Sequence, residues 1–210
     1  MRLLYTFLFL ISLLQTNKVF AQETILVKHE DGNYYEEYLS LKNDTSIKHG
    51  SYLRFYKGKV IEKGQFSNNT KIGKWLYFSL DAIFEYEYNY DTQRISKISG
   101  KDKVEDYVQT PVYFKGSPII PYLFLIKNIR YPIEAKKHNI KGRVSLAIQI
   151  NNLGEIVSFY VREKLHPLLD KAVVDVAKTF PNNWQWIPAQ YNGHNIDGEY
   201  IINIEFELVE

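Results

Sequence analysis

The stretch RVSLAIQINNLGEIVSFYVRE, residues 143–163, decides the expected fold of the second half of the chain. Apolar and polar side chains alternate on both sides of the turn at residues 151–154, a pattern typical of two half-buried strands in a hairpin. In each strand the apolar residues share one face. They are Val144, Leu146, Ile148 and Ile150 in the first strand and Val157, Phe159 and Val161 in the second.

Two helices are expected around this hairpin. Apolar residues recur every three or four positions from Pro167 to Thr179, which predicts an amphipathic helix. A shorter helix is expected from Ile133 to His138, with Pro132 at its first turn, where a missing N–H group is no loss.

The end of the chain, EYIINIEFEL at residues 199–208, alternates again and predicts a last strand. One face carries the apolar side chains, and the other is mostly polar. The apolar face comprises Tyr200, Ile202, Ile204, Phe206 and Leu208, and the polar residues are Glu199, Asn203, Glu205 and Glu207. The order helix, strand, strand, helix, strand predicts a small α+β domain, in which a three-stranded antiparallel sheet carries both helices on one face.

Several blocks of this half resemble, in order, the TonB C-terminal domain family. They are YPIEAKKHNIKGRVSLAIQINNLGEIVSFYV, LLDKAVVDVAK, WQWIPAQYNGHNI and INIEFEL. The preceding PVYFKGS and FLIKNIRYP resemble one envelope branch of that family, so the resemblance covers about residues 111–208. It implies a periplasmic module that binds a short extended segment of an outer-membrane receptor, the TonB box, by adding it to the sheet.

The candidate binding residues follow from this resemblance and from the unpaired backbone that a last strand can offer. They form the strand Glu199, Tyr200, Ile201, Ile202, Asn203, Ile204, Glu205 and Phe206, with Tyr131 and Pro132 beside it by family carry-over. In full-length transducers, a membrane-spanning helix and a long proline-rich spacer also connect the domain to an inner-membrane energy-coupling complex. This sequence departs on both counts, which argues against direct energy coupling.

The first half repeats a short motif. Residues 32–36, 58–62 and 81–85 share a turn residue, two apolar residues and a glutamate, and a second element begins at Gly50 and again at Gly73. HGSYLRFYKGKVIEKGQFSNNTKIGKWLYF resembles the MORN-like repeats of bacterial antitoxin-like and envelope proteins. The pattern predicts a stacked array of β-hairpins.

The aromatic residues of the array allow two interpretations. They could present a surface to a peptide or glycan, or pack on neighbouring hairpins, and packing is favoured because strand aromatics are usually buried. The residues are Tyr52, Phe55, Trp75, Tyr77 and Phe78.

The N-terminus MRLLYTFLFLISLLQTNKVFAQ predicts a secretory signal peptide cleaved after Ala21, because its apolar run is shorter than the roughly 20 residues of a spanning helix. A periplasmic or cell-envelope location is therefore expected, rather than an inner-membrane anchor.

Cleavage would remove Arg2 and Lys18 and leave 24 basic against 24 acidic residues, so no nucleic-acid partner is expected. The chain has no cysteine and hence no disulfide. The expected organisation is signal peptide 1–21, repeat domain 22–95, linker 96–110 and TonB C-terminal-like domain 111–210.

No constellation of catalytic, metal-ligating or cofactor-binding residues is recognisable, so we expect neither an enzyme nor a cofactor or metal site. Asp170 and Asp175 point in different directions on the predicted helix. Trp184, Trp186 and Pro188 could form a ligand clamp, although core packing is favoured. A basic cluster is expected on a solvated face and comprises Lys136, Lys137, Lys141 and Arg143.

The leading hypothesis is thus a non-enzymatic periplasmic binding protein in TonB-dependent transport, with an outer-membrane TonB-dependent receptor as its partner. The alternative is a cell-envelope scaffold. In that case the repeats would bind a protein or peptidoglycan, and the C-terminal domain would form a homodimer through its exposed strand edge.

Overall fold

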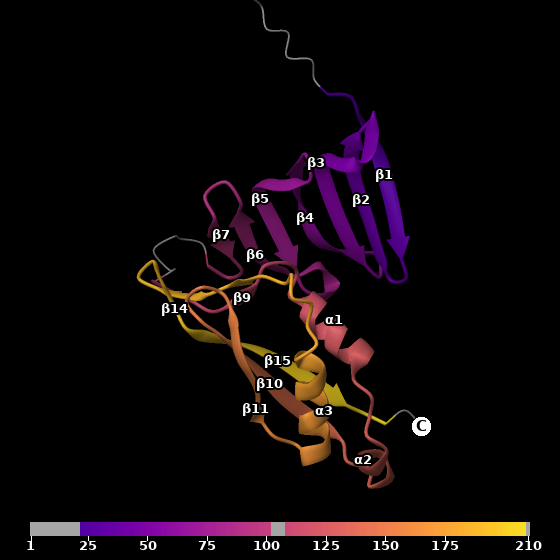
Figure 1. Ribbon diagram of the computed structural model, residues 1–210, viewed down its shortest axis with the longest axis vertical. Helices are drawn as coiled ribbons and strands as arrows, with labels where there is room; N and C mark the ends of the chain where they lie inside the picture. Colours follow the sequence, from indigo (N-terminus) through magenta and orange to yellow (C-terminus); the bar gives the residue numbers. More distant parts are fainter. Residues whose placement is uncertain (1–21, 102–107, 209–210) are drawn as a thin grey trace, which may run out of the picture.

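The computed structural model describes residues 22–101 and 108–208. The predicted signal peptide, residues 1–21, lies outside them. Figure 1 shows a large hairpin sheet in the upper half and a smaller α+β part below it, with helix α1 (Ile119–Asn128) between the two.

Seven strands form the hairpin sheet as an antiparallel meander in chain order. They are β1 (Thr24–Asp31), β2 (Tyr34–Leu41), β3 (Asp44–Tyr56), β4 (Lys59–Ser67), β5 (Thr70–Phe78), β6 (Phe84–Asn89) and β7 (Arg94–Ile98). This sheet is consistent with the expected hairpin array. Strand β7 extends into the segment that the sequence assigns to a linker.

The repeated turn residues serve two different purposes. Gly32 and Gly58 lie in hairpin turns with φ of 60° and 75°, and Asp81 replaces the glycine with φ of 61° in the 3-10 turn η1 (Leu80–Ala82). Gly50 and Gly73, by contrast, lie inside β3 and β5, where the strand register shifts at a β-bulge. The second repeated element therefore marks a bulge rather than a turn.

The aromatic residues of the array mostly pack inside it, as favoured. Tyr52, Trp75 and Tyr77 are buried in a common cluster, while Phe55 and Phe78 are half-buried. The indole of Trp75 lies so close to Gly64 that a Cβ atom there would be 2.2 Å from the indole Cδ2. Burial of these rings is what makes the glycine necessary.

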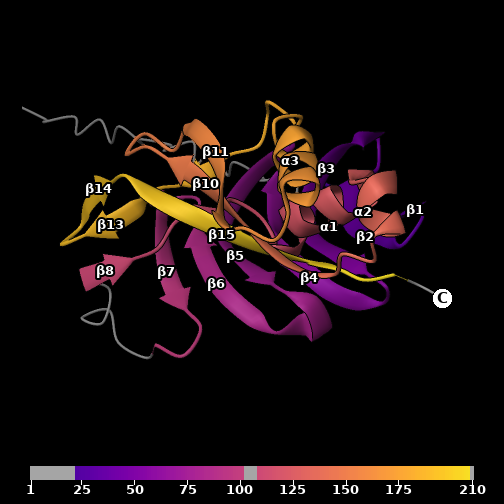
Figure 2. The same ribbon diagram turned by 90° about the horizontal axis from the view of Figure 1, so that it is seen from below.

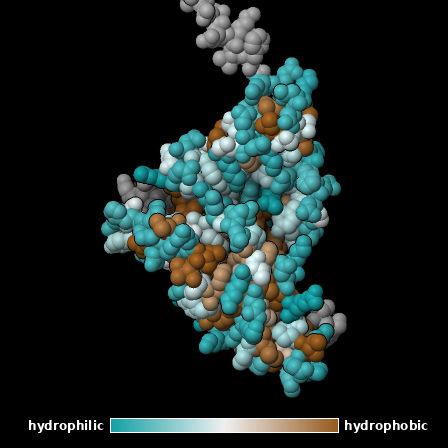
Figure 3. Space-filling model, in the orientation of Figure 1, coloured by the Kyte–Doolittle hydropathy of each residue, from teal (hydrophilic) through white to brown (hydrophobic). Residues whose placement is uncertain are grey.

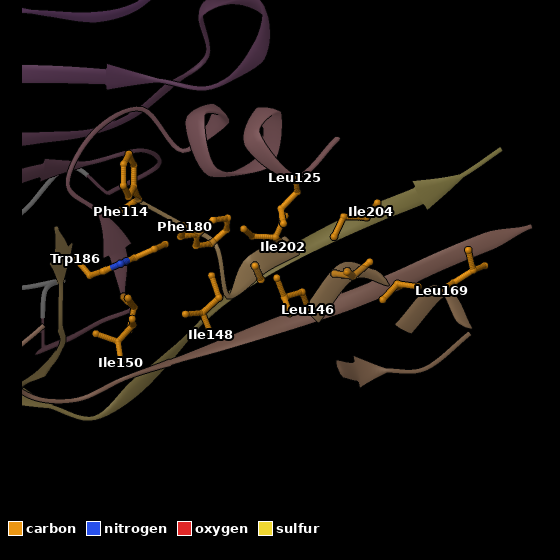
Figure 4. Close-up of a cluster of buried hydrophobic side chains, with 14 of the residues drawn as sticks. Phe114, Leu125, Leu146, Ile148, Ile150, Leu169, Phe180, Trp186, Ile202 and Ile204 are labelled. Carbon is orange, nitrogen blue, oxygen red and sulfur yellow. The ribbon is translucent and has the colours of Figure 1, made fainter. Parts of the chain in front are cut away.

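The lower part contains the expected three-stranded antiparallel sheet, in the order β11-β10-β15. Its strands are β10 (Gly142–Ile150), β11 (Ile156–Glu163) and β15 (Gly198–Phe206). The two predicted helices are present as α2 (Ile133–Lys137) and α3 (Pro167–Ala177), while α1 is an additional helix. Figure 4 shows side chains from α1, α3, β10 and β15 converging on one apolar core.

One predicted side-chain direction is wrong. Val157 is 64% exposed, whereas Ile156, Phe159 and Val161 pack on the core. The register between β10 and β11 shifts from Gln149↔Ser158 to Ile150↔Ile156, so an extra residue at position 157 bulges out of the ladder. Such a bulge reverses the alternation beyond it.

Short strands complete the lower part (Figure 2). β9 (Tyr113–Phe114) pairs with β12 (Trp186–Ile187), and β13 (Ala189–Tyr191) lies between β14 (His194–Ile196) and β8 (Gln109–Thr110). The segment after β9 is hydrogen-bonded to the hairpin sheet: Ser117 donates its backbone N–H to the carboxylate of Glu62 at 3.2 Å and its hydroxyl to the carbonyl of Phe78 at 2.5 Å. Buried polar contacts thus connect the two halves.

Candidate functional site

Strand β15 is an edge strand, and its pairing with β10 is continuous. Nine residue pairs, from Gly142↔Phe206 to Ile150↔Gly198, follow one another without a register shift. Among the described residues, no backbone hydrogen bond joins β15 to any strand but β10. The outward-directed N–H and C=O groups of a regular edge strand are free to pair with another extended chain.

The inner face of β15 anchors the strand in the core. Ile202, Ile204 and Phe206 are buried there, and the ring of Tyr200 packs against Trp186 with centroids 5.0 Å apart. Burial raises the pKa of Tyr200, so its hydroxyl stays protonated. This face confirms the alternation that the sequence predicts and holds the strand at a fixed position.

The outer face of β15 carries polar pairs that run across the sheet. Ser145 donates a hydrogen bond to the side-chain oxygen of Asn203 at 2.7 Å, and Arg143 forms an ion pair with Glu205. Tyr160 and Arg162 of β11 both reach the carboxylate of Glu199. These side chains pair across the sheet with one another, and none of these contacts uses a backbone group of β15.

The opposite edge of the sheet, β11, is less regular. Its register with β10 shifts twice, once between Ser145 and Leu146 and once between Gln149 and Ile150. Bulges twist an edge and interrupt the row of outward-facing donors and acceptors, which hinders the addition of another strand. Of the two edges, β15 has the uninterrupted register, whereas the register of β11 is interrupted twice.

Tyr131 and Pro132 lie near the C-terminal end of β15. The ring of Tyr131 packs edge-on against Phe206 with centroids 5.5 Å apart, and its hydroxyl donates to the carbonyl of Ile140. Pro132 occupies the N-cap position of α2, immediately before its first residue. The structure therefore brings Tyr131 into contact with the candidate strand, while Pro132 follows it at the start of the helix.

The remaining sequence candidates have structural roles. Trp186 is buried in the core, Asp170 accepts a hydrogen bond from the backbone N–H of Leu165 at 3.0 Å, and Asp175 pairs with Lys171. All four members of the basic cluster are exposed, as expected. Lys137 pairs with Glu134 and Arg143 with Glu205, and the other two members are Lys136 and Lys141.

The sequence did not lead us to predict one feature of the hairpin sheet. Two lysine side chains there lie over the faces of aromatic rings. Lys48 lies 4.8 Å from the ring centroid of Tyr52, and Lys71 lies 3.9 Å from that of Trp75. Each lysine stands two residues before a bulge glycine and four before its ring, so the repeated K-x-G-x-[YW] pattern was the available signal. The repeated glutamate completes each unit, since Glu36 pairs with Lys48 at 3.1 Å and Glu62 with Lys71 at 3.9 Å.

Within residues 22–101 and 108–208, histidine, aspartate and glutamate side chains form no group of three that could bind a metal ion. No helix in those ranges has the length and apolar character needed to cross a membrane.

Residues 127–208, less than half of the chain, match the family model described as Gram-negative bacterial TonB protein C-terminal. The match supports the family assignment of this segment, which contains β10, β11, β15, α2 and α3. Domains of this family are non-enzymatic interaction modules that contact outer-membrane receptors, and the proteins are periplasmic or associated with the cell envelope. No curated protein and no solved structure matches the chain.

Proposed function

We propose that this protein captures an extended peptide, the TonB box of an outer-membrane receptor, by adding it as a fourth strand along β15. Its role is to support TonB-dependent transport across the outer membrane from the periplasmic side. The observation that carries the proposal is the uninterrupted nine-pair register of β15 on β10 in a segment that matches the TonB C-terminal family.

Strand addition draws its affinity from backbone hydrogen bonds. The bound peptide would align with Glu199 to Phe206, and one end of the peptide would approach Tyr131 and Pro132. Only every second residue of the bound peptide directs its N–H group toward β15, because successive residues of a strand alternate in hydrogen-bonding direction. Side chains of the bound peptide would contact the polar outer face of β15 around Asn203 and Glu205.

A scan of N-methylated peptides tests this mechanism without changing the protein. A synthetic TonB-box peptide is methylated at one amide nitrogen at a time, and binding to residues 22–210 is measured by calorimetry. Strand addition predicts an alternating profile, in which methylation at every second position weakens binding about tenfold or more and the positions between are tolerated. A profile without alternation, or no binding of the parent peptide, would refute the proposal.

Self-association of the protein would use the same backbone hydrogen bonds as peptide binding, so it has to be measured separately. If β15 of one copy pairs with β15 of another, the protein is dimeric and the peptide must compete with the dimer. Sedimentation velocity with and without the TonB-box peptide distinguishes the cases. Dimers that persist at saturating peptide would place the interface elsewhere.

A further inference from the structure

A cleft of about 580 Å³ lies between the start of the hairpin sheet and helix α1. Its walls are aromatic and aliphatic, with Tyr34 and Tyr56 on the sheet side and Leu123 and Phe124 on the helix side. The surface in Figure 3 is hollowed where the hairpin sheet meets the lower part. A volume of this size is typical of sites for small organic molecules.

Arg54 supplies the principal charge of the cleft. Its guanidinium lies over the ring of Tyr34 at 5.0 Å from the centroid, and its Nε atom is buried without a hydrogen-bond partner among the described residues. The nearest acid is Glu36, whose carboxylate is 3.5 Å from that nitrogen. A guanidinium carries five N–H donors in a planar fork, so Arg54 has donors available for a planar acceptor such as a carboxylate.

The charged side chains around Arg54 leave one positive charge in excess. Arg54 stands in register with Glu36 on β2 and with Glu62 on β4. Glu36 also pairs with Lys48 at 3.1 Å and Glu62 with Lys71 at 3.9 Å, so two carboxylates serve three cations. Two further charged residues of opposite sign, Asp31 and Lys127, also line the cleft. A ligand with one negative charge would balance the site.

We propose that this cleft binds a small apolar carboxylate, with its hydrophobic group between the tyrosine rings and α1 and its carboxylate on Arg54. The site lies between residues far apart in the sequence and is separate from the β15 edge. It therefore does not depend on peptide capture there.

The test uses residues 22–210 and two probes, N-acetyl-L-phenylalanine and its uncharged carboxamide, followed by amide chemical-shift titration. We expect saturable shifts in β2, β3 and α1 with the acid, and at least fivefold weaker binding of the carboxamide. Arg54→Gln should weaken binding of the acid at least fivefold and leave the carboxamide unaffected. Equal affinities of the two probes, or no saturable shift at the cleft with either, would overturn the proposal.

A second variant guards against misfolding of the first. Ile126 is 45% exposed and lines the cleft, so Ile126→Glu adds a repelling charge at little cost in packing. It should weaken binding of the acid more than that of the carboxamide. Ile83→Glu is the matched control, because Ile83 is 58% exposed and lies outside the cleft lining. An acid affinity reduced equally by both variants would contradict a site at α1.

Discussion

The hydroxyl oxygen of Tyr86 lies 2.5 Å from the carbonyl oxygen of Phe114, and this contact connects β6 of the hairpin sheet to β9 of the lower part. The same hydroxyl accepts a hydrogen bond from the backbone N–H of Gly116 at 3.1 Å. Because all three groups are buried, the segment that leads into α1 is held against the sheet by bonds that water does not replace.

Tyr86→Phe should therefore destabilise the whole chain by about 1–3 kcal/mol, since the carbonyl of Phe114 and the N–H of Gly116 lose their partner in a buried environment. Urea unfolding measures the change. Tyr88→Phe on the same strand is the control, because the Tyr88 hydroxyl bonds to the exposed side chain of Gln93, and its loss should cost well under 1 kcal/mol. Equal losses in the two variants would contradict a buried connection.

Gly64→Ala should also destabilise the protein, by about 1–3 kcal/mol, because the added methyl group has no space beside the Trp75 indole. Thermal unfolding followed by circular dichroism gives the change. Ser51→Ala, at an exposed position of the neighbouring strand, should change the stability by less than about 0.5 kcal/mol. A Gly64→Ala variant as stable as the wild type would mean that the ring moves away freely.

The sequence predicted the parts of this fold that depend on local pattern. Alternation placed Ile202, Ile204 and Phe206 on the buried face of β15, and helical spacing placed Leu169 and Val173 in the core. These residues follow a simple period because each element is buried on one side only. The MORN-like identity of the hairpin array stays a prediction.

Helix α1 shows why the rest could not be predicted. Ile119 and Leu123 pack on the hairpin sheet, whereas Leu125 packs in the core of the lower part. A helix buried on two sides has no polar face, so its sequence lacks the amphipathic period. The cleft beside it was missed for a related reason: Arg54 and Phe124 meet only through the packing of the two halves.

Glu36 should make stability depend on acid pH. Burial alone would raise its pKa, but the hydrogen bond from Tyr52 and the charge of Lys48 hold the pKa below the usual value of 4.5. The folded state therefore favours the ionised carboxylate, and this contribution is present above about pH 4.5 and lost as the pH falls through the lower pKa of the folded state.

We expect Glu36→Gln to lower the free energy of unfolding at neutral pH and to flatten its decline between about pH 5 and pH 3. Urea unfolding across this range measures the slope. Glu30→Gln, at an exposed position of β1, should leave the wild-type decline unchanged. A decline in Glu36→Gln as steep as in the wild type would assign the acid sensitivity to other carboxylates.

Proline substitutions at two adjacent positions of β15 test the edge from the protein side. Neighbouring residues of a strand direct their N–H groups to opposite sides, so one of Ile202 and Asn203 donates toward β10 and the other toward the open edge. Proline removes one donor at each position. Ile202→Pro and Asn203→Pro should therefore differ: one loses a bond of the β10 ladder and is strongly destabilised, while the other stays folded and binds the TonB-box peptide at least tenfold more weakly.

Asn203→Ala separates the backbone effect from the side-chain effect at the exposed position, since it removes only the hydrogen bond with Ser145 and should retain peptide affinity within about threefold. Circular dichroism and calorimetry on each variant give folding and affinity. A proline variant that is folded and binds as tightly as Asn203→Ala would show that the peptide does not pair with the backbone of β15 at that position.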